Sequence, residues 1–198
     1  MYRVFGMAES GNCYKVKLLL SQLGEKFEWV ETDIMQGKSR TGEFLAMNPN
    51  GKVPTLEISP GVYLPESNAI LCYLAEGTPY WPGDRLTRAR AMQWLFFEQY
   101  SHEPYVAVAR FMLLLLKQPN HPDLAEKQRR GHLALAVMDQ HLAREAFFVG
   151  AQYSVADIAL YAYTHVADEA GIDLAPYPAL RAWLARVKSQ PGYVPMYG

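Results

Sequence analysis

The chain has 198 residues, a length that fits one domain or two small packed ones. Its 19 basic and 20 acidic side chains give a formal net charge of −1, so no overall field would draw it to nucleic acid or to an acidic membrane surface. Two cysteines, Cys13 and Cys72, are too few for a disulfide framework. We therefore expect a small-molecule partner, with no nucleic acid and no membrane.

The start of the chain and its apolar runs bear on its location. The residues that follow Met1 contain neither a basic leader nor the apolar segment of a secretory signal. The longest aliphatic run, Phe111 to Leu116, is far shorter than the roughly 20 residues that span a bilayer. We expect a soluble, cytoplasmic protein.

Strand and helix patterns alternate over the first 77 residues. The apolar run from Tyr2 to Gly6 predicts a buried strand, and helical spacing of apolar residues predicts a helix over residues 15–23 that ends at Gly24. Three more strands and a helix are predicted at residues 27–32, 54–58, 62–64 and 67–75. The order βαβ, a short irregular or helical piece, then ββα fits a small mixed sheet with helices on its faces.

Residues 77–84 are dense in turn-forming residues and mark a boundary, after which the patterns are helical. Helices are predicted at residues 86–117, 124–144, 154–169 and 178–188. Pro104 should bend the first of these. The sequence therefore predicts an α/β domain at residues 1–77, a linker at 78–85 and an all-helical domain at 86–198.

Residues 10 to 13, Ser-Gly-Asn-Cys, occupy the turn from the first strand into the first helix. With Cys in place of Ser10 they would read Cys-x-x-Cys beside a βαβ pattern, the redox motif of thioredoxin-like proteins. The missing sulfur excludes a dithiol relay at this motif. The Ser10 hydroxyl would then either donate a hydrogen bond to a thiolate supplied by a ligand or simply cap the helix, with Cys13 as a small buried apolar residue.

Lys52, Val53 and Pro54 precede a predicted strand, where proline belongs at the first residue or at an edge. A cis bond between Val53 and Pro54 would turn the Val53 amide and carbonyl outward and offer an extended peptide two backbone hydrogen bonds. The alternative is an ordinary trans proline, the commoner form, since only about 5 to 6% of X-Pro bonds in folded proteins are cis.

Glu66 and Ser67 come just before an apolar helical run, where backbone N–H groups lack partners and the helix dipole favours a carboxylate. Ser67 would bind that carboxylate through its hydroxyl and amide, while Glu66 accepts a hydrogen bond from a nearby ammonium group. The alternative is plain helix capping by the serine.

Taken together, these features closely resemble the cytosolic glutathione transferases of the serine type, in the theta, tau, phi and bacterial nu-like groups. The motifs that carry the resemblance are Ser10 with Lys15-Val16, Asn48 through Pro54, and Glu66-Ser67. The resemblance extends over the whole chain, and Ser154 to Asp157 looks like the capping box that begins a helix of the family's second domain. It implies a thioredoxin-like N-terminal domain, an all-α C-terminal domain, a homodimer, glutathione as co-substrate and no metal.

The resemblance also implies which residues bind glutathione. Ser10 would donate to the glutathione sulfur, and Asn12 falls where nu-like members carry an Asn close to the sulfur. Val53 would pair with the cysteinyl backbone. The remaining implied contacts are Glu66 and Ser67 for the γ-glutamyl end, Lys52 for the glycyl carboxylate, and Arg40 or Lys38 in support of Lys52.

An electrophile would bind between the domains, with the helix around Pro104 as one wall. The candidate contacts are Met7, Tyr105 and Met112, and by analogy with the family Glu98 would reach the glutathione amine of the partner subunit. The five histidines show no metal-binding spacing, so we expect solvated or capping histidines.

The predicted function is conjugation of the glutathione thiolate to a small hydrophobic electrophile, a detoxification reaction. Two alternatives stay open. The same site would serve a glutathione-dependent disulfide or peroxide reductase, or the fold would be kept as a non-enzymatic binding or regulatory module.

Overall fold

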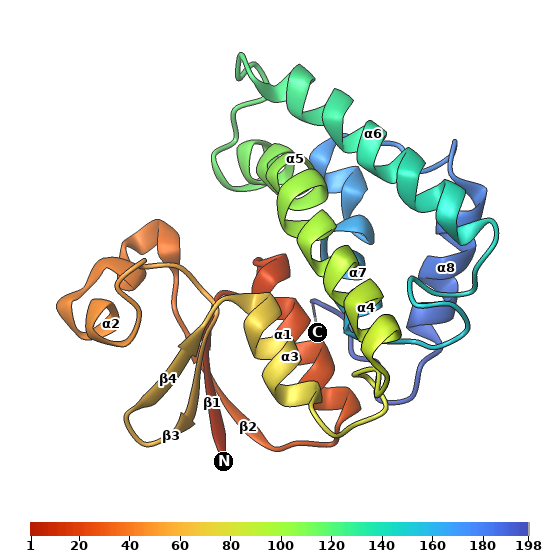
Figure 1. Cartoon of the computed structure of the whole chain (residues 1–198). Coiled ribbons are helices and arrows are strands. Elements are labelled where there is room, and N and C mark those ends of the chain that lie inside the picture. Colours follow the sequence, from red (N-terminus) through yellow and green to blue (C-terminus); the bar gives the residue numbers. More distant parts are fainter. Residues whose placement is uncertain (198) are drawn as a thin grey trace. The chain divides into compact units, whose positions relative to one another are not determined.

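A computed structural model of the chain describes residues 1–197, which form two compact units (Figure 1). Unit one contains Met1–Thr78 together with the end of the chain from Pro191, and unit two contains Pro79–Gln190. The sequence assigned everything from residue 86 onward to the second domain. The segment after Gln190 instead packs with the first unit.

The sheet of unit one has four strands: β1 (Tyr2–Gly6), β2 (Phe27–Glu31), β3 (Thr55–Ser59) and β4 (Val62–Pro65). Their order in the sheet is β2-β1-β3-β4. β1 runs parallel to β2 and antiparallel to β3, and β3 runs antiparallel to β4. All four predicted strands are present, with their ends shifted by at most a residue.

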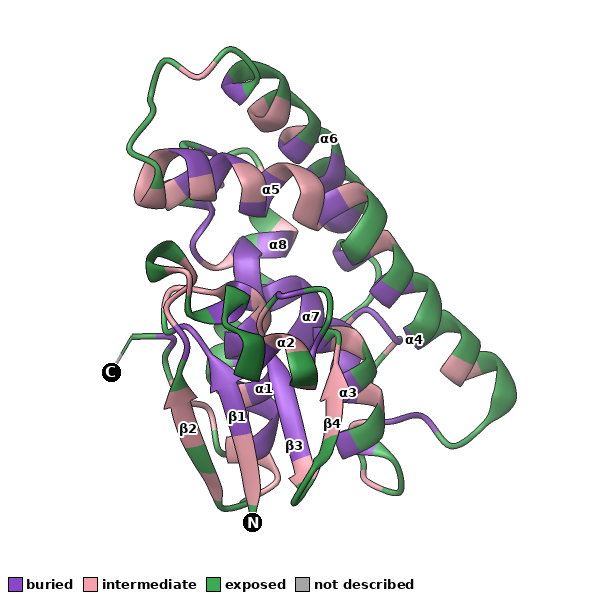
Figure 2. Ribbon diagram, turned by 90° about the vertical axis from the view of Figure 1, so that its left-hand side faces the viewer, coloured by how far each residue is buried: buried purple, intermediate pink, exposed green. Residues whose placement is uncertain are grey.

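The helices of unit one are α1 (Gly11–Gln22), α2 (Gly42–Met47) and α3 (Ser67–Ala75), with two short 3-10 turns at Ile34–Gln36 and Lys38–Arg40. α1 and α3 lie together on one side of the sheet, and α2 lies on the other (Figures 1 and 2). This mixed sheet with its helices is the predicted thioredoxin-like fold.

α1 begins at Gly11 rather than at residue 15, because the Ser10 side chain caps it by accepting a hydrogen bond from the Cys13 amide at 3.3 Å. The apolar periodicity could not reveal this first turn, since Gly11 and Asn12 are not apolar. α1 ends at Gln22, one residue before the predicted end, and Gly24, whose φ of +69° suits a glycine, follows the C-cap residue Leu23.

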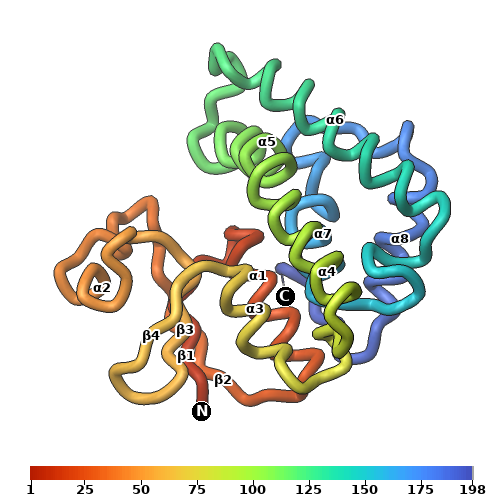
Figure 3. Tube along the Cα trace, in the orientation of Figure 1, coloured from red at the N-terminus to blue at the C-terminus, as the bar shows by residue number. Residues whose placement is uncertain are grey.

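The last described residues of the chain lie beside α1 (Figure 3), and hydrogen bonds from α1 side chains to the backbone carbonyls of residues 194–196 hold them there. Tyr14 Oη donates to the Val194 carbonyl at 2.8 Å, and Lys17 Nζ lies 3.2 Å from the carbonyls of Pro195 and Met196. These bonds explain why this segment belongs to unit one. A sequence pattern carries no signal for them, because their acceptors are backbone atoms.

Unit two contains α4 (Arg85–Phe97), α5 (Glu103–Arg110), α6 (Leu124–Leu142), α7 (Val155–Thr164) and α8 (Pro178–Lys188). The long helix expected at residues 86–117 is interrupted by π-helical turns at Glu98–His102 and Phe111–Leu115. Pro104 lies in the first turn of α5, directly after the first of these π-helical turns.

The core of unit two forms around α7, whose ten residues are all buried (Figure 2). α7 ends at Thr164, and a 3-10 turn at Ala167–Ala170 completes the segment expected as helix up to residue 169. The predicted capping box is present. The Ser154 side chain accepts a hydrogen bond from a backbone amide of the first helical turn, and the Asp157 side chain accepts one from the Ser154 amide.

Two isolated β-bridges, Phe147 with Gly150 and Val149 with Gln152, are small departures from the expected all-helical pattern. Within residues 1–197, no helix combines the length and apolar character needed to cross a bilayer. The same residues hold no cluster of three or more His, Cys, Asp or Glu side chains arranged to bind a metal.

Candidate functional site

Ser10 lies at the N-terminus of α1, half-buried, with an extended backbone. Its Oγ accepts the hydrogen bond from the Cys13 amide, so the expected capping role is confirmed. A hydroxyl that accepts one hydrogen bond still has a proton to donate. The capping role and the predicted donor role are therefore compatible at this residue.

The protein's own sulfur atoms are poor nucleophiles. Cys13 is fully buried, as expected for a small apolar residue, and burial raises the pKa of its thiol to about 12. Burial likewise raises the pKa of Cys72 to about 11. Because only a thiolate attacks, neither cysteine supplies a reactive sulfur near neutral pH.

Glu66 stands at the N-cap position of α3, exposed, with a positive φ of +69° and no side-chain cap bond. A non-glycine residue in this region is uncommon, and such strain gathers at functional sites. Ser67 is the first helical residue and does not cap α3, so the capping interpretation of Ser67 is wrong. The first turn of α3 keeps N–H groups without a side-chain cap, which suits an anion.

Hydrogen bonds join the beginnings of α1 and α3. Ser67 is 5% exposed, and its Oγ donates to Asn12 Oδ1 at 3.2 Å. Lys15 Nζ donates to Ser67 Oγ at 3.3 Å and to Asn68 Oδ1 at 3.2 Å. The structure thus brings together Asn12, two residues from Ser10, and Ser67, which lies far along the sequence.

The sequence placed Lys15 in the motif that carries the family resemblance but indicated no binding role for it, and it gave no indication of Asn68. The sequence does not separate Lys15 from Lys17, because Lys17 also stands between buried residues and yet bonds the carbonyls of Pro195 and Met196. Only the fold shows that Lys15 is buried, and a buried charge calls for a specific partner.

The loop before β3 is shaped by Asn48. Its Nδ2 donates to the Lys52 carbonyl at 2.8 Å and to Thr55 Oγ1 at 3.3 Å. The Val53–Pro54 bond is cis, which decides between the two alternatives drawn from the sequence. Lys52 is exposed and Val53 is half-buried.

Of the two basic candidates ahead of α2, Arg40 lies against this loop. Arg40 Nη1 donates to the Asn50 carbonyl at 3.2 Å. Gly51 has a φ of +64°, and a Cβ there would come within 2.5 Å of Arg40 Nη1, so a glycine is needed beneath the guanidinium group. Lys38 is exposed within a 3-10 turn.

The predicted electrophile contacts belong to different units. Met7 is 5% exposed in unit one, and Met112 is 7% exposed in unit two. The ring of Tyr105, also in unit two, lies under the guanidinium group of Arg130 at 4.7 Å and the Lys127 ammonium at 5.4 Å. Their shared pocket stays a prediction.

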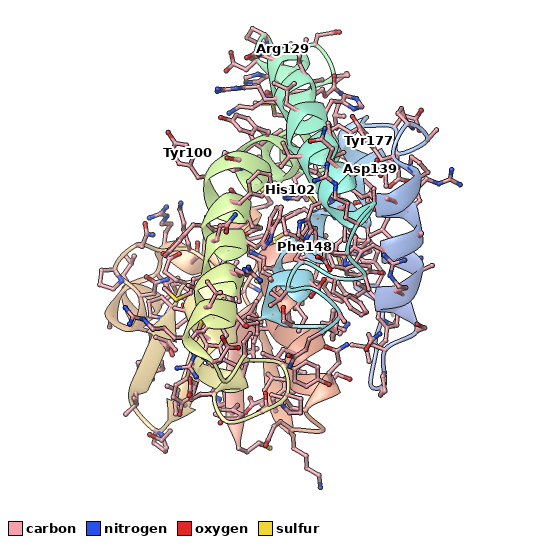
Figure 4. The ribbon with its side chains drawn as sticks, turned by 45° about the vertical axis from the view of Figure 1, so that its right-hand side comes forward. Tyr100, His102, Arg129, Asp139, Phe148 and Tyr177 are labelled. Carbon is pink, nitrogen blue, oxygen red and sulfur yellow. The ribbon has the colours of Figure 1, made fainter. Side chains whose placement is uncertain are left out.

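Glu98 and His102 differ from what the sequence suggested. Glu98 is fully buried and accepts a hydrogen bond from Gln99 Nε2 at 2.8 Å, so its carboxylate does not face outward as a contact with a partner subunit requires. His102 is also fully buried, with Nε2 at 3.0 Å from Thr164 Oγ1, and the expectation of a solvated or capping histidine is wrong for it. Figure 4 shows His102 within unit two and Tyr100 projecting outward.

Comparisons with known proteins agree with these observations. The family model described as the glutathione S-transferase N-terminal domain matches residues 1–76, and the C-terminal domain model matches residues 90–191. A crystal structure of a glutathione S-transferase from Pseudomonas fluorescens Pf-5 is 52% identical, with a TM-score of 0.97 over 100% of this chain and 99% of that one.

Two curated relatives are more distant. The disulfide-bond oxidoreductase YfcG of Escherichia coli K12 is 29% identical, over 93% of this chain and 89% of that protein. Glutathione S-transferase 3 of Zea mays is also 29% identical, over 96% of this chain and 90% of that protein. Since the family models match both halves of the sequence and the fold agrees, the chain belongs to the glutathione S-transferase family.

Proposed function

We propose that this protein binds glutathione and transfers its thiolate to a small hydrophobic electrophile. The observation that carries the proposal is the hydrogen bond from Ser67 to Asn12 at 3.2 Å. It joins the position assigned to the γ-glutamyl end of glutathione to the helix turn assigned to its sulfur. The protein's own thiols, with pKa values raised by burial, leave the sulfur to the ligand.

In this proposal each end of the tripeptide meets a group of matching character. The Val53 backbone pairs with the cysteinyl residue, and Glu66 with Ser67 holds the ammonium and carboxylate of the γ-glutamyl residue. Lys52 neutralises the glycyl carboxylate. Arg40 supports it by lying against the same loop at Asn50.

Ser10 makes this a serine-type enzyme by stabilising the thiolate, with Asn12 as a second donor. A free thiol has a pKa of about 8.5, and lowering it by about 2 units takes roughly 2.7 kcal/mol. A hydrogen bond to a charged group contributes about 1.5 to 3 kcal/mol, and a helix N-terminus adds roughly 0.3 to 1 kcal/mol. Ser10 and α1 together are sufficient, with no metal or histidine base in the step.

In the reaction, the thiol proton leaves to solvent and the thiolate attacks an electrophilic carbon. A sulfur–carbon bond forms, and the leaving group departs with its electron pair. Met7, Tyr105 and Met112 are the proposed contacts of the electrophile, since Met and aromatic side chains accept many apolar compounds.

A second candidate is glutathione-dependent reduction of a disulfide. The similarity to a disulfide-bond oxidoreductase favours it, together with Asn12 at the start of α1. Here the thiolate attacks a disulfide sulfur and releases one thiol. A second glutathione then attacks the mixed disulfide, releasing the other thiol and oxidised glutathione.

One set of measurements separates these functions. Calorimetric titration gives the affinity for glutathione, and turnover is measured with a chloronitrobenzene and with a mixed disulfide. Conjugation as the faster activity supports transfer, and disulfide turnover alone supports the second candidate. Binding without either turnover indicates a binding module, and absence of glutathione binding would overturn the proposal.

We also propose a cytoplasmic homodimer. Met92, Phe96 and Tyr100 recur every four residues along α4 and the turn after it, and they are 40%, 66% and 83% exposed. Apolar side chains at this spacing share one face, and a contiguous exposed apolar stripe marks an interaction surface. A second copy of the chain is the occupant that the family suggests.

A further inference from the structure

Lys15 has an unusual environment for a lysine. Lys15 is 0% exposed, and it lies in α1 between two neighbours that are also buried. Taking an ammonium group out of water costs several kcal/mol, whereas a leucine or methionine would fill the same space without that cost. A charge kept at such a position calls for a function that uses it.

The side chain of Lys15 leads directly to the start of α3. Side chains of a helix lean toward its N-terminus, so Lys15 reaches back along α1 toward Asn12. Its Nζ donates to Ser67 Oγ at 3.3 Å and to Asn68 Oδ1 at 3.2 Å, in the first turn of α3. The ammonium charge therefore lies immediately behind the residue assigned to the γ-glutamyl end.

Two sources of positive potential meet at this point. The N-terminus of α3 is the positive end of a helix dipole, and it has no side-chain cap. Lys15 adds a full positive charge beside it. The positive helix end and the Lys15 ammonium repel each other, which destabilises the ligand-free protein locally. An anion bound in front of Ser67 reduces this repulsion.

The same contact sets the direction of the Ser67 hydroxyl. Because Lys15 donates to Ser67 Oγ, that oxygen's proton points away from Lys15, and in the free protein it goes to Asn12 Oδ1. When a carboxylate arrives, the hydroxyl is already oriented as a donor. Asn12 is then released from this bond, next to the turn assigned to the sulfur.

We propose that Lys15 is a positioning residue for glutathione, acting through Ser67 to select the α-carboxylate of the γ-glutamyl residue. The inference rests on the proposed function, since it deepens the assignment of Ser67. It predicts that removing the Lys15 charge weakens glutathione more than it weakens an analogue without that carboxylate.

The test compares glutathione with 4-aminobutyryl-cysteinyl-glycine, in which hydrogen replaces the α-carboxylate. In Lys15→Met, glutathione affinity should fall about tenfold or more, which is about 1.4 kcal/mol, and the analogue's affinity by less than about threefold. Lys17→Met is the matched control: Lys17 is in the same helix but bonds the carbonyls of Pro195 and Met196, so both affinities should stay unchanged.

The outcomes are distinguishable. Equal losses for both ligands in Lys15→Met would mean that Lys15 only supports the fold, and the inference would be overturned while the proposed function stood. If the wild type fails to bind glutathione, the proposed function itself fails.

A second measurement covers the case in which Lys15→Met does not fold. In wild-type protein carrying nitrogen-15 lysine, the Lys15 ammonium signal, identified by its loss in Lys15→Arg, should shift on addition of glutathione and much less with the analogue. Equal shifts with both ligands, or none, would contradict the inference.

Discussion

Lys52 and Lys38 form a matched pair of exposed lysines in unit one, and only Lys52 lies in the loop that leads into β3. If Lys52 meets the glycyl carboxylate, Lys52→Ala should weaken glutathione binding about fivefold, as expected for an exposed charge pair. Lys38→Ala should change it less than about twofold. The difference should shrink at high ionic strength, because salt screens exposed charges. If calorimetry gave the same loss of glutathione affinity for the two variants, Lys52 would not be the contact of the glycyl carboxylate.

His165 gives unit two a dependence on pH. Its ring stacks on Tyr161 at 4.6 Å, and burial lowers its pKa from 6.5 to about 4. The folded state favours the neutral ring, so this stabilisation is complete above about pH 6.5 and is lost as the pH falls toward 4.

The variant His165→Phe keeps a ring but cannot titrate. Between pH 7 and pH 4 it should lose roughly 2 to 3 kcal/mol less unfolding free energy than the wild type, measured by urea denaturation at each pH. Asp157, whose pKa burial raises to about 6, titrates in the same range in both proteins and cancels in the comparison. Parallel pH profiles for the two proteins would show that His165 does not contribute.

At single residues, local chemistry predicted some features and not others. Ser10 was expected as a possible helix cap and does cap α1, whereas the expected cap at Ser67 is absent. The sequence left the isomer of the Val53–Pro54 bond open, and the structure shows it to be cis. The role of Lys15 was not predicted, although the residue is part of the family motif, because that role depends on its burial and on its contact with Ser67, 52 positions away. The histidine interpretation failed for His102 for the same reason, since burial comes from packing.

The start of α7 illustrates how one element depends on a buried cap. Asp157 is fully buried and accepts hydrogen bonds from the Phe148 amide at 3.1 Å, Trp183 Nε1 at 2.9 Å and the Ser154 amide at 2.9 Å. Asp84 caps α4 through the Leu86 and Thr87 amides, but it is exposed. When an exposed cap such as Asp84 is lost, water can accept hydrogen bonds from the freed amides. When Asp157 is lost, its donors stay buried without an acceptor.

We therefore expect Asp157→Ala to destabilise the fold by about 3 to 5 kcal/mol, and Asp84→Ala by only about 0.5 to 2 kcal/mol. Urea denaturation followed by circular dichroism measures both. Similar losses in the two variants would mean that the bonds to Phe148 and Trp183 contribute little.

At the scale of whole elements, some helix boundaries can be predicted from the residue pattern and others cannot. α3 and α8 begin and end where the sequence placed them, and α8 starts with Pro178, a residue favoured in a first helical turn. The π-helical turns at Glu98–His102 and Phe111–Leu115 keep a helical composition, so nothing in the residue types separates them from α4 and α5.

For the whole molecule, the two-unit organisation followed from the change in pattern near residue 78, but the return of the chain's end to unit one did not.

The proposed homodimer also belongs to this scale. Phe96→Glu puts a charge in the stripe of Met92, Phe96 and Tyr100 and should convert dimer to monomer in analytical ultracentrifugation. Leu133→Glu, on an exposed apolar residue of α6, is the control and should leave the dimer intact. Dissociation by both variants, or by neither, would place the interface elsewhere.

The state of the bound thiol tests the central claim most directly. The ultraviolet absorbance of glutathione thiolate is titrated against pH on the wild type, Ser10→Ala and Ser10→Thr. On the wild type the thiol should titrate well below its free pKa of about 8.5; Ser10→Ala should move it back by about 1 to 2 units, and Ser10→Thr, which keeps hydroxyl and cap, should not. A bound thiol with an unshifted pKa, or one that Ser10→Ala leaves unchanged, would contradict the assignment of Ser10 as the residue that keeps the sulfur ionised.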